Sequence, residues 1–410
     1  MIKRVFAIML TLSLLTFGAC DNKSAEQSST VSKKQQTNES SSSVQSEIVP
    51  AVNDYSERTY MLAEITQYLK LDGRWATAKT GADTGAQPCI TFDHTAQLLA
   101  FNADCEGDVV LKMTNKCNDA QPGRNERYYL VEVDGKETRM KIEAVAGAEA
   151  AQTLVLATGL KRGSHTFKIY RQTELNFGYD NLVSVTMKGV PTERPADKER
   201  YIEFLGDSVT AGYGNLTVRE DANSPSNPDR SSGTDTYAFK TAKLLNADIS
   251  TVARSGLAYS YGLGMPITDY WNKISWQRSS LGDYKSERTP DVVVIALGTN
   301  DHNYYKSKGV TEDQLYQVAF DLIKLVRETR PDSKIVWYYG IMGTGYEDEA
   351  GLFVKDYIKR AIDDNGGDKA GIYLCMAKAP NFDGGGWHPS QAGHEAGAQE
   401  LAQFIEGILK

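Results

Sequence analysis

One stretch near the middle of the chain constrains the fold most, namely residues 201–214 with the sequence YIEFLGDSVTAGYG. Its apolar run ends at Leu205, and Gly206, Asp207 and Ser208 follow at once. This pattern predicts a buried strand, a sharp turn and the first turn of a helix. Ser208 would then lie at the carboxyl end of a parallel strand, where open α/β sheets place their reactive groups. Free backbone N–H groups at a helix start can also stabilise an oxyanion, although simple helix capping would place a serine there equally well.

Four further apolar runs follow the first, and together they predict a parallel sheet. The five runs cover residues 201–205, 248–253, 292–297, 334–339 and 371–375. Each is short and largely apolar, as expected of strands that are buried on both faces. Apolar stripes of helical period lie between them, and one begins with the capping box Thr311–Gln314. Residues 198–410 are therefore predicted to form a doubly wound, flavodoxin-like α/β domain.

The preceding part, residues 48–190, has a different pattern, in which short runs rich in Val, Leu, Thr, Tyr and Phe alternate with turn residues. Period-two patterning at this spacing predicts a β-sandwich of the jelly-roll type. In one run His165, Phe167 and Ile169 share a face, so we interpret His165 as a packed sheet residue rather than a catalytic one. The polar segment 191–198, which contains two prolines, marks the boundary between the domains.

Cysteines in the first domain raise the question of a disulfide. Cys89, Cys105 and Cys117 lie there, and this odd number suggests one pair and one remaining thiol if the protein is exported. Cys105 and Cys117 are the closest in sequence, but sequence alone does not fix which two cysteines would pair. Cys375 falls in an expected buried strand and is interpreted as a core residue.

The amino-terminal end predicts export. A basic start, an apolar run from Val5 to Phe17 and small residues before Cys20 indicate a signal peptide over residues 1–19. The ending Gly-Ala-Cys resembles a bacterial lipobox, which implies lipid attachment at Cys20; ordinary export with a free Cys20 is the alternative. Residues 20–47 are polar and are expected to be a disordered, lipid-anchored linker. We therefore expect a cell-envelope lipoprotein, periplasmic or on the cell surface, that contacts the membrane through its anchor.

Composition and motifs exclude several functional classes. The net charge of −8 gives no basic patch of the kind that binds nucleic acid. The sequence contains no phosphate-binding loop, no HExxH motif and no cysteine–histidine cluster at zinc spacing. Neither a nucleotide site nor a metal site is therefore predicted.

Three further motifs fall at strand ends in this scheme, and they are Ser255-Gly256, Gly298–Asp301 and Trp387–Ser390. The carboxyl ends of parallel strands meet at one edge of a sheet, so we expect all three motifs beside Ser208. His388 can act as a general base for the Ser208 hydroxyl near neutral pH. Attack on an ester would then generate an oxyanion.

Three donors are available for that oxyanion. They are the backbone N–H groups of Ser208 and Gly256 and the side-chain amide of Asn300. Two other histidines, His302 just past Asn300 and His394 inside the last helix, are less favourably placed relative to the strand ends.

These motifs resemble the four sequence blocks of the SGNH (GDSL-type) hydrolases, in the right order, from about residue 201 to the end. The stretch after Gly206, the segment Ala253–Gly256 and the segment Gly340–Gly343 resemble more narrowly carbohydrate esterase family 2. Enzymes of that family pair an amino-terminal jelly roll with an SGNH domain. The resemblance implies a carbohydrate O-acetylesterase that removes acetyl groups from polysaccharides such as xylan and glucomannan, and it implies no metal or organic cofactor.

One position departs from the common SGNH pattern. Most of these enzymes carry an aspartate three residues before the histidine, and here that position is Gly385. Family 2 esterases commonly show this loss, and the resemblance implies a Ser–His dyad in which a backbone carbonyl orients His388. Asp383, reaching in through three glycines, is the alternative third member. An inactive relative would also explain the loss.

Trp387 directly precedes the expected base, where its indole either stacks on a sugar ring or packs inside the domain. Two rival functions remain open at this point. One is an esterase that acts on another exported ester, such as acetylated peptidoglycan or a lipid. The other is a non-catalytic sugar-binding protein whose β-sandwich is the working part.

Overall fold

The computed structural model describes residues 55–118, 121, 123–145, 147–221, 227–261, 266–269, 271–343, 345 and 353–410, without the side chains of 303–306. From residue 52 onward the chain forms one compact unit. The signal peptide and linker predicted for residues 1–47, with Cys20, lie outside the described residues. None of the helices in the described ranges is long and apolar enough to span a membrane.

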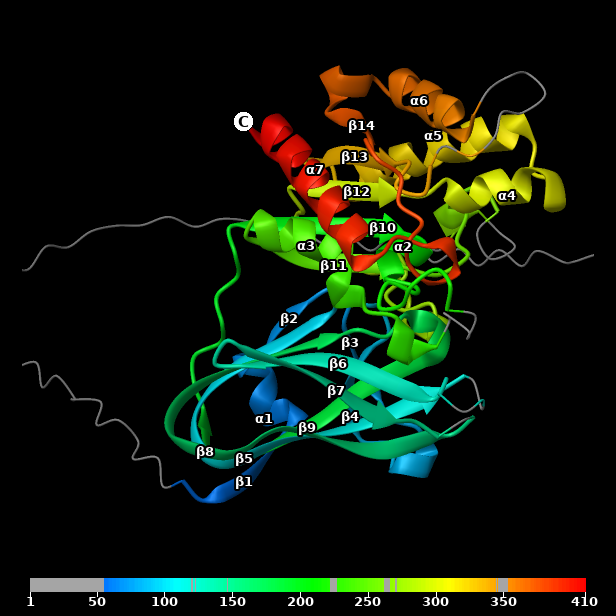
Figure 1. Cartoon of the computed structure of the whole chain (residues 1–410). Helices are drawn as coiled ribbons and strands as arrows, with labels where there is room; N and C mark the ends of the chain where they lie inside the picture. Colours follow the sequence, from blue (N-terminus) through cyan, green and yellow to red (C-terminus); the bar gives the residue numbers. More distant parts are fainter. Residues whose placement is uncertain are drawn as a thin grey trace, which may run out of the picture. The chain divides into compact units, whose positions relative to one another are not determined.

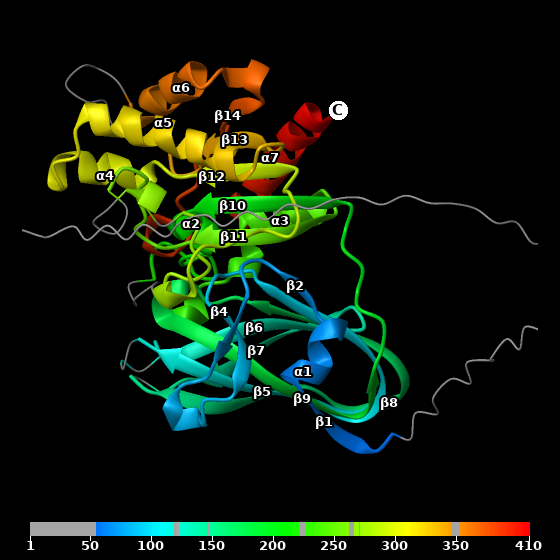
Figure 2. The same cartoon turned by 180° about the vertical axis from the view of Figure 1, so that it is seen from behind.

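The chain folds into two sheets that follow one another in the sequence (Figures 1 and 2). The strands of the first are β1 (Glu57–Met61), β2 (Lys70–Asp72), β3 (Ala76–Lys79), β4 (Pro88–Phe92), β5 (Leu98–Cys117), β6 (Glu126–Val133), β7 (Lys136–Glu143), β8 (Glu149–Arg171) and β9 (Gly178–Pro191). Those of the second are β10 (Arg200–Gly206), β11 (Ala247–Ala253), β12 (Val292–Ala296), β13 (Lys334–Tyr339) and β14 (Ile372–Met376). The α-helices are α1 (Leu62–Ile65), α2 (Ser208–Ala211), α3 (Tyr237–Leu244), α4 (Thr299–Ser307), α5 (Glu312–Thr329), α6 (Val354–Asp364) and α7 (Gln391–Leu409).

The second sheet is parallel throughout, and its strand order is β11-β10-β12-β13-β14. This is the flavodoxin-like order, in which the chain reverses direction of winding after the first strand. The predicted doubly wound parallel sheet is therefore confirmed. The direction of winding reverses at the boundary between the neighbouring strands β10 and β12. Ser208 follows the carboxyl end of β10.

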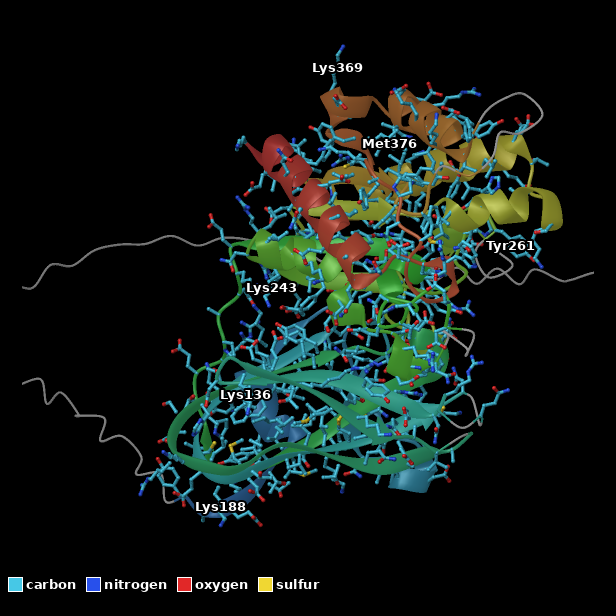
Figure 3. The ribbon with its side chains drawn as sticks, viewed as in Figure 1. Lys136, Lys188, Lys243, Tyr261, Lys369 and Met376 are labelled. Atoms are coloured by element: carbon cyan, nitrogen blue, oxygen red, sulfur yellow. The ribbon has the colours of Figure 1, made fainter. Side chains whose placement is uncertain are left out.

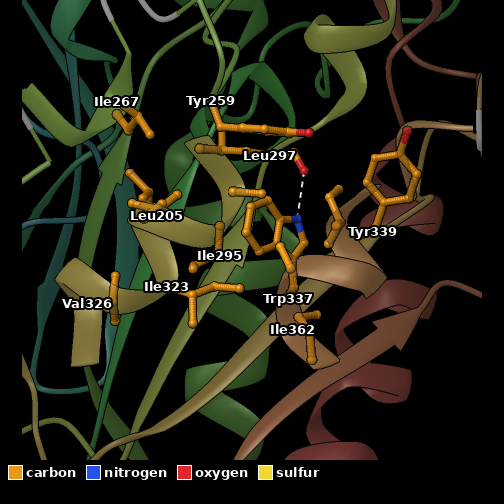
Figure 4. Close-up of a cluster of buried hydrophobic side chains, with 14 of the residues drawn as sticks. Leu205, Tyr259, Ile267, Ile295, Leu297, Ile323, Val326, Trp337, Tyr339 and Ile362 are labelled. Atoms are coloured by element: carbon orange, nitrogen blue, oxygen red, sulfur yellow. Dashed lines mark hydrogen bonds between the residues drawn. The ribbon is translucent and has the colours of Figure 1, made fainter. Parts of the chain in front are cut away.

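Both faces of the parallel sheet are buried, because alternate strand residues point to opposite sides. Phe204 belongs to a core with residues of α3 and α7, whereas its neighbour Leu205 belongs to a core with residues of α5 and α6. Figure 4 shows the second of these cores around Trp337, whose indole nitrogen donates to the carbonyl of Leu297 at 2.9 Å. The rings of Tyr259 and Trp337 form a T-shaped pair with their centroids 5.4 Å apart.

The first sheet is antiparallel, with the order β3-β4-β9-β5-β8-β6-β7, and β1 and β2 pair with β9 and β5. Its long strands β5 and β8 have 20 and 23 residues. The register between them shifts near Gly107, which indicates bulges that bend the strands. Phe101 and Phe167 stack at 4.7 Å inside the resulting core.

The expected disulfide in the first domain is wrong. Cys105 and Cys117, the two cysteines closest in sequence, both lie on β5, twelve positions apart. A strand rises about 3.3 Å per residue, so their sulfur atoms are far beyond the reach of a disulfide bond. No disulfide joins the four described cysteines, Cys89, Cys105, Cys117 and Cys375, which are all buried.

The two sheets are connected by buried ionic contacts within the compact unit. Arg74, which follows β2, donates to Glu203 in the middle of β10 at 2.9 Å, and both side chains are fully buried. Arg330 donates to the other oxygen of the Glu203 carboxylate at 3.0 Å. Figure 3 labels Lys243 on α3, at the surface of the second domain, and its ammonium nitrogen lies 3.6 Å from a carboxylate oxygen of Glu137 on β7. The first sheet is thus bound to β10, an interior strand of the second sheet.

Candidate active site

The turn between β10 and α2 places Ser208 at the carboxyl edge of the parallel sheet. Asp207 caps the short helix, because its carboxylate accepts from the N–H of Val209 at 3.0 Å. A β-carbon at Gly206 would lie 2.0 Å from Oγ1 of Thr210, so this glycine is required by packing. Ser208 follows with only 6% of its surface exposed.

The structure brings His388 to Ser208 across 180 residues of sequence. Nε2 of the imidazole lies 2.8 Å from the Ser208 hydroxyl oxygen. Nδ1 lies 2.9 Å from the carbonyl oxygen of Gly386. A carbonyl only accepts, so Nδ1 carries the proton and Nε2 offers its lone pair to the hydroxyl. This is the tautomer that a general base needs.

The loop before His388 contains left-handed backbone conformations and contacts the glycine-rich stretch that follows Ser208. Gly386 and Trp387 both have left-handed conformations, with φ of 61° and 63°. The N–H of Gly385 donates to the carbonyl of Gly214 at 2.9 Å. A β-carbon at Gly214 would lie 2.4 Å from the carbonyl oxygen of Gly385, so only glycine allows this approach.

Asp383 lies on the surface, and its carboxylate accepts from the side-chain amide of Asn381 at 3.0 Å. The contact to Nδ1 of His388 comes instead from the peptide carbonyl of Gly386. Burial lowers the pKa of His388, and the carbonyls of Gly386 and Gly385 oppose this shift in part. The imidazole is therefore neutral, and able to accept a proton, at neutral pH.

Asn300 contacts the two turns that carry the other expected oxyanion donors. Arg254 to Leu257 form a turn closed by the N–H of Leu257 on the carbonyl of Arg254, and Gly256 has the positive φ of 80° that a type II turn requires at its third residue. The amide nitrogen of Asn300 donates to the carbonyl of Leu257 at 3.0 Å and lies 3.4 Å from the carboxylate of Asp207. Asn300 therefore stands between the serine turn and the glycine turn.

Two buried carboxyl groups lie behind these donors. Asp301 accepts from the N–H groups of Tyr259 and Ser260, and burial raises its pKa to about 6. Burial, aided by the charge of Asp301, raises the pKa of Asp207 to about 7. A carboxyl group that is partly protonated at neutral pH opposes a negative charge forming nearby less than a full carboxylate would.

Trp387 lies outside the hydrophobic core, with 62% of its surface exposed. The alternative that it packs inside the domain is therefore wrong. The guanidinium of Arg219 lies 4.8 Å from the centre of its ring. His394, by contrast, is fully buried in α7 and accepts from the backbone N–H of Tyr237 at 3.1 Å, and His302 lies beside Gly345.

Some parts of the site were not expected from the sequence. Tyr213, whose ring lies 4.5 Å from that of His388, stands in the same glycine-rich stretch as Ser208, and its position between two glycines was a usable signal. Asp207 was visible in the motif, but its contact with Asn300 depends on the folded sheet. Arg219 lies in a polar loop where no local pattern distinguishes it.

A scan of family models matches residues 204–396 to the GDSL-like lipase/acylhydrolase family. The cellulase/esterase CelE of Acetivibrio thermocellus is 30% identical over 276 residues, which are 63% of this chain and 32% of that protein. The acetylxylan esterase/glucomannan deacetylase of Cellvibrio japonicus is 24% identical over 256 residues, or 56% of this chain and 66% of that protein. The chain thus spans about a third of the first relative and just under two thirds of the second.

Among solved structures, a family two carbohydrate esterase from Clostridium thermocellum in complex with cellohexaose superposes with a TM-score of 0.69. The match covers 83% of this chain and 99% of that one at 24% identity. At this identity the likeness speaks for the fold, which is that of the SGNH hydrolases. The resemblance predicted from the four motifs is confirmed: the chain carries a GDSL-like lipase/acylhydrolase domain at residues 204–396, and its curated and structural relatives include acetylxylan esterases of carbohydrate esterase family 2.

Proposed function

We propose that this protein is a carbohydrate O-acetylesterase, a carboxylic ester hydrolase that removes acetyl groups from polysaccharides such as xylan and glucomannan. The observation that carries the proposal is the 2.8 Å contact between Nε2 of His388 and the hydroxyl of Ser208, with Nδ1 bound to a peptide carbonyl. A serine in contact with a correctly oriented neutral imidazole is an activated nucleophile.

In the proposed reaction, the Ser208 hydroxyl attacks the acetyl carbonyl and His388 takes its proton. The negative charge that forms on the carbonyl oxygen is stabilised by the N–H groups of Ser208 and Gly256 and by the amide of Asn300. The protonated imidazole then gives its proton to the departing sugar oxygen, which leaves an acetyl-serine. Water, deprotonated by His388, attacks this ester. The protonated imidazole then returns its proton to the Ser208 oxygen as the bond to the acetyl carbon breaks and acetate is released.

The pH dependence of the reaction follows from the environment of His388. Its pKa is lowered, so the imidazole loses catalytic competence only as the pH falls below the ordinary value of 6.5. We expect log kcat/KM to fall with a slope of about one as the pH drops below that value. Steady-state rates on a soluble acetate ester between about pH 4 and pH 8 measure this. A midpoint above 6.5 would contradict the proposal, because it would indicate a carboxylate partner such as Asp383.

The proposed substrate class draws on the relatives and on Trp387. One relative is named for acetylxylan and glucomannan, and another was solved with cellohexaose. Trp387 adopts a left-handed φ, which is strained for a bulky residue, and gains little burial in return. A tryptophan with a strained backbone and an exposed side chain contributes little to stability, so a role in binding explains it better. An exposed indole beside Ser208 and His388 can stack on a sugar ring.

Replacing Trp387 by asparagine should therefore separate binding from stability. Asparagine tolerates the left-handed backbone but offers no ring, so we expect KM for an acetylated oligosaccharide to rise about three- to tenfold. The value of kcat should change little, and the melting temperature should not fall. Trp387→Phe is the matched control and should keep most of the affinity. An unchanged KM in the asparagine variant would remove Trp387 from the substrate site.

The function itself is tested by acetate release from acetylated xylan and acetylated glucomannan. Serine-dependent release from either polymer would establish the esterase and rank the substrates. Polysaccharide binding without acetate release would favour the sugar-binding alternative. Hydrolysis of acetylated peptidoglycan or of a lipid ester alone would favour the other enzymatic alternative.

We further propose that the protein is exported and held at the cell envelope by a lipid on Cys20, on the strength of the sequence of residues 1–47. We also propose that the nine-stranded antiparallel sheet is a jelly-roll sandwich. The great length of β5 and β8 and the register shifts that bend them support this topology.

A further inference from the structure

The first sheet reaches the candidate active site through the segment that joins β8 to β9. Glu174 in this segment accepts two hydrogen bonds on one carboxylate oxygen, from the N–H of Ser255 at 2.9 Å and from its hydroxyl at 2.8 Å. The other oxygen accepts from the amide of Asn176 at 3.3 Å. Asn176 in turn accepts from the guanidinium of Arg254. Two neighbouring side chains of the first domain thus bind two consecutive residues of the second.

The residues that are bound belong to the glycine turn at the oxyanion site. Ser255 is the second residue of that turn and directly precedes Gly256, whose N–H is one of the proposed donors. A turn of this type contains three peptide units. The contact with Glu174 holds the N–H of the first unit, which adjoins the unit that carries the N–H of Gly256. Displacing a catalytic donor by about 1 Å can lower a rate about a hundredfold.

The same segment also supports the loop after the nucleophile. The carbonyl of Gln172 accepts from the N–H of Gly233 at 3.0 Å, and its amide donates to the hydroxyl of Thr234 at 2.7 Å. Ser232, the preceding residue, receives a donated bond from the Asn215 amide at 2.9 Å. The segment 172–176 therefore lies against both loops that flank Ser208.

We propose that Glu174 is a positioning residue for ester hydrolysis, because it holds the Ser255–Gly256 turn in the geometry that receives the oxyanion. The β-sandwich domain is then part of the catalytic apparatus. This inference rests on the proposed esterase function. Glu174 is buried, and removing a carboxylate from water costs free energy. Apolar packing would join the two domains without that cost, so the buried carboxylate favours a role beyond holding the domains together.

The chain offers a matched control on the same strand. At the amino end of β11, Lys70 of the first domain lies 2.7 Å from the buried carboxylate of Asp248. Ser255 follows the carboxyl end of that strand. Lys70→Met therefore breaks a buried contact between the domains at the edge opposite Ser208, and Arg288 still accompanies Asp248 at 2.6 Å.

The test compares wild type, Glu174→Ala, Glu174→Gln and Lys70→Met in kcat, KM and melting temperature on a soluble acetate ester. We expect Glu174→Ala to lower kcat about ten- to a hundredfold with KM close to that of wild type. Glutamine retains an acceptor for Ser255 and should restore most of kcat. Lys70→Met should lower the melting temperature and leave kcat within about twofold, since it acts far from the oxyanion.

A second measurement avoids any dependence on the sugar. An alkyl fluorophosphonate labels an activated serine through a species whose phosphoryl oxygen occupies the oxyanion site. Its rate of labelling Ser208 should fall in Glu174→Ala by a factor similar to that for kcat. If that variant does not fold, Ser255→Ala removes the hydroxyl bond alone and should lower both rates by a smaller factor.

The outcomes separate this inference from the proposed function. If wild type is active and folded Glu174→Ala has unchanged kcat and an unchanged labelling rate, the positioning role alone is overturned. Where Glu174→Ala does not fold, the same result in Ser255→Ala overturns it. A kcat loss in Lys70→Met as large as in Glu174→Ala would also overturn it, because general loosening would then explain both. A wild type that neither releases acetate nor reacts with the fluorophosphonate would overturn the esterase function and the inference with it.

Discussion

Replacing Ser208 by alanine is expected to lower kcat for acetyl ester hydrolysis by about 10⁴-fold or more, with the fold intact. The hydroxyl is the proposed nucleophile, and alanine leaves no atom that can form the acetyl intermediate. Ser208 has one side-chain partner of consequence, Nε2 of His388, so its loss removes little packing. Acetate release and the circular dichroism spectrum of the purified variant measure activity and folding together.

Two companion variants sharpen this result. His388→Ala should lose a comparable factor, and the double variant should lose little more, because the two side chains act as a unit. Asp383→Ala is the matched control, since its carboxylate contacts Asn381 rather than the imidazole. It should retain at least about half of the activity. A loss in Asp383→Ala close to that of His388→Ala would replace the dyad by a triad, and near-normal hydrolysis by Ser208→Ala would exclude the mechanism.

The second large effect is expected at Asn300. Asn300→Ala should lower kcat about a hundred- to a thousandfold while KM changes little, because the amide donates to a charge that exists only in the transition state. One of its bonds is already given to the carbonyl of Leu257, whereas its 3.4 Å approach to Asp207 is long. The amide can therefore turn part of its donor capacity to the oxyanion. An effect confined to KM would instead assign Asn300 to substrate binding.

The parallel sheet could be predicted from the sequence because each of its strands is marked by a pattern of neighbouring residues. A strand buried on both faces reads as an uninterrupted apolar run, and the run predicted at 201–205 lies inside the observed strand Arg200–Gly206. Parallel topology then brings distant strand ends together without any knowledge of side-chain contacts. Ser208 and His388 could be paired in this way because each directly follows or precedes a recognisable element.

The first domain was harder to predict, since its strands are long and irregular. Two separate runs, at 98–101 and 109–113, turn out to be parts of the single strand β5. The charged and glycine residues between them look like a turn, but bulges allow the strand to continue through them. Because the strand continues, Cys105 and Cys117 are held far apart although they are close in sequence.

Contacts between the domains left no signal in the sequence. Glu174 and Ser255 are 81 positions apart, and nothing in the neighbourhood of either residue indicates the other. Burial of a carboxylate depends on the final packing of two separately patterned domains. The pairing of Ser208 with His388 was therefore predictable, whereas the contact between Glu174 and Ser255 was not.

The ion pairs of Glu203 affect how the two domains can be exchanged by recombination or in protein engineering. The second domain alone, beginning after residue 199, would keep Arg330 but lose Arg74. The Glu203 carboxylate on β10 would then have one of its two arginine partners. Recombination that exchanges only the hydrolase half between proteins would break the same pairing. The natural unit of exchange is therefore the pair of domains together, and a chimaera designed from this scaffold should take its junction before β1 rather than between the two sheets.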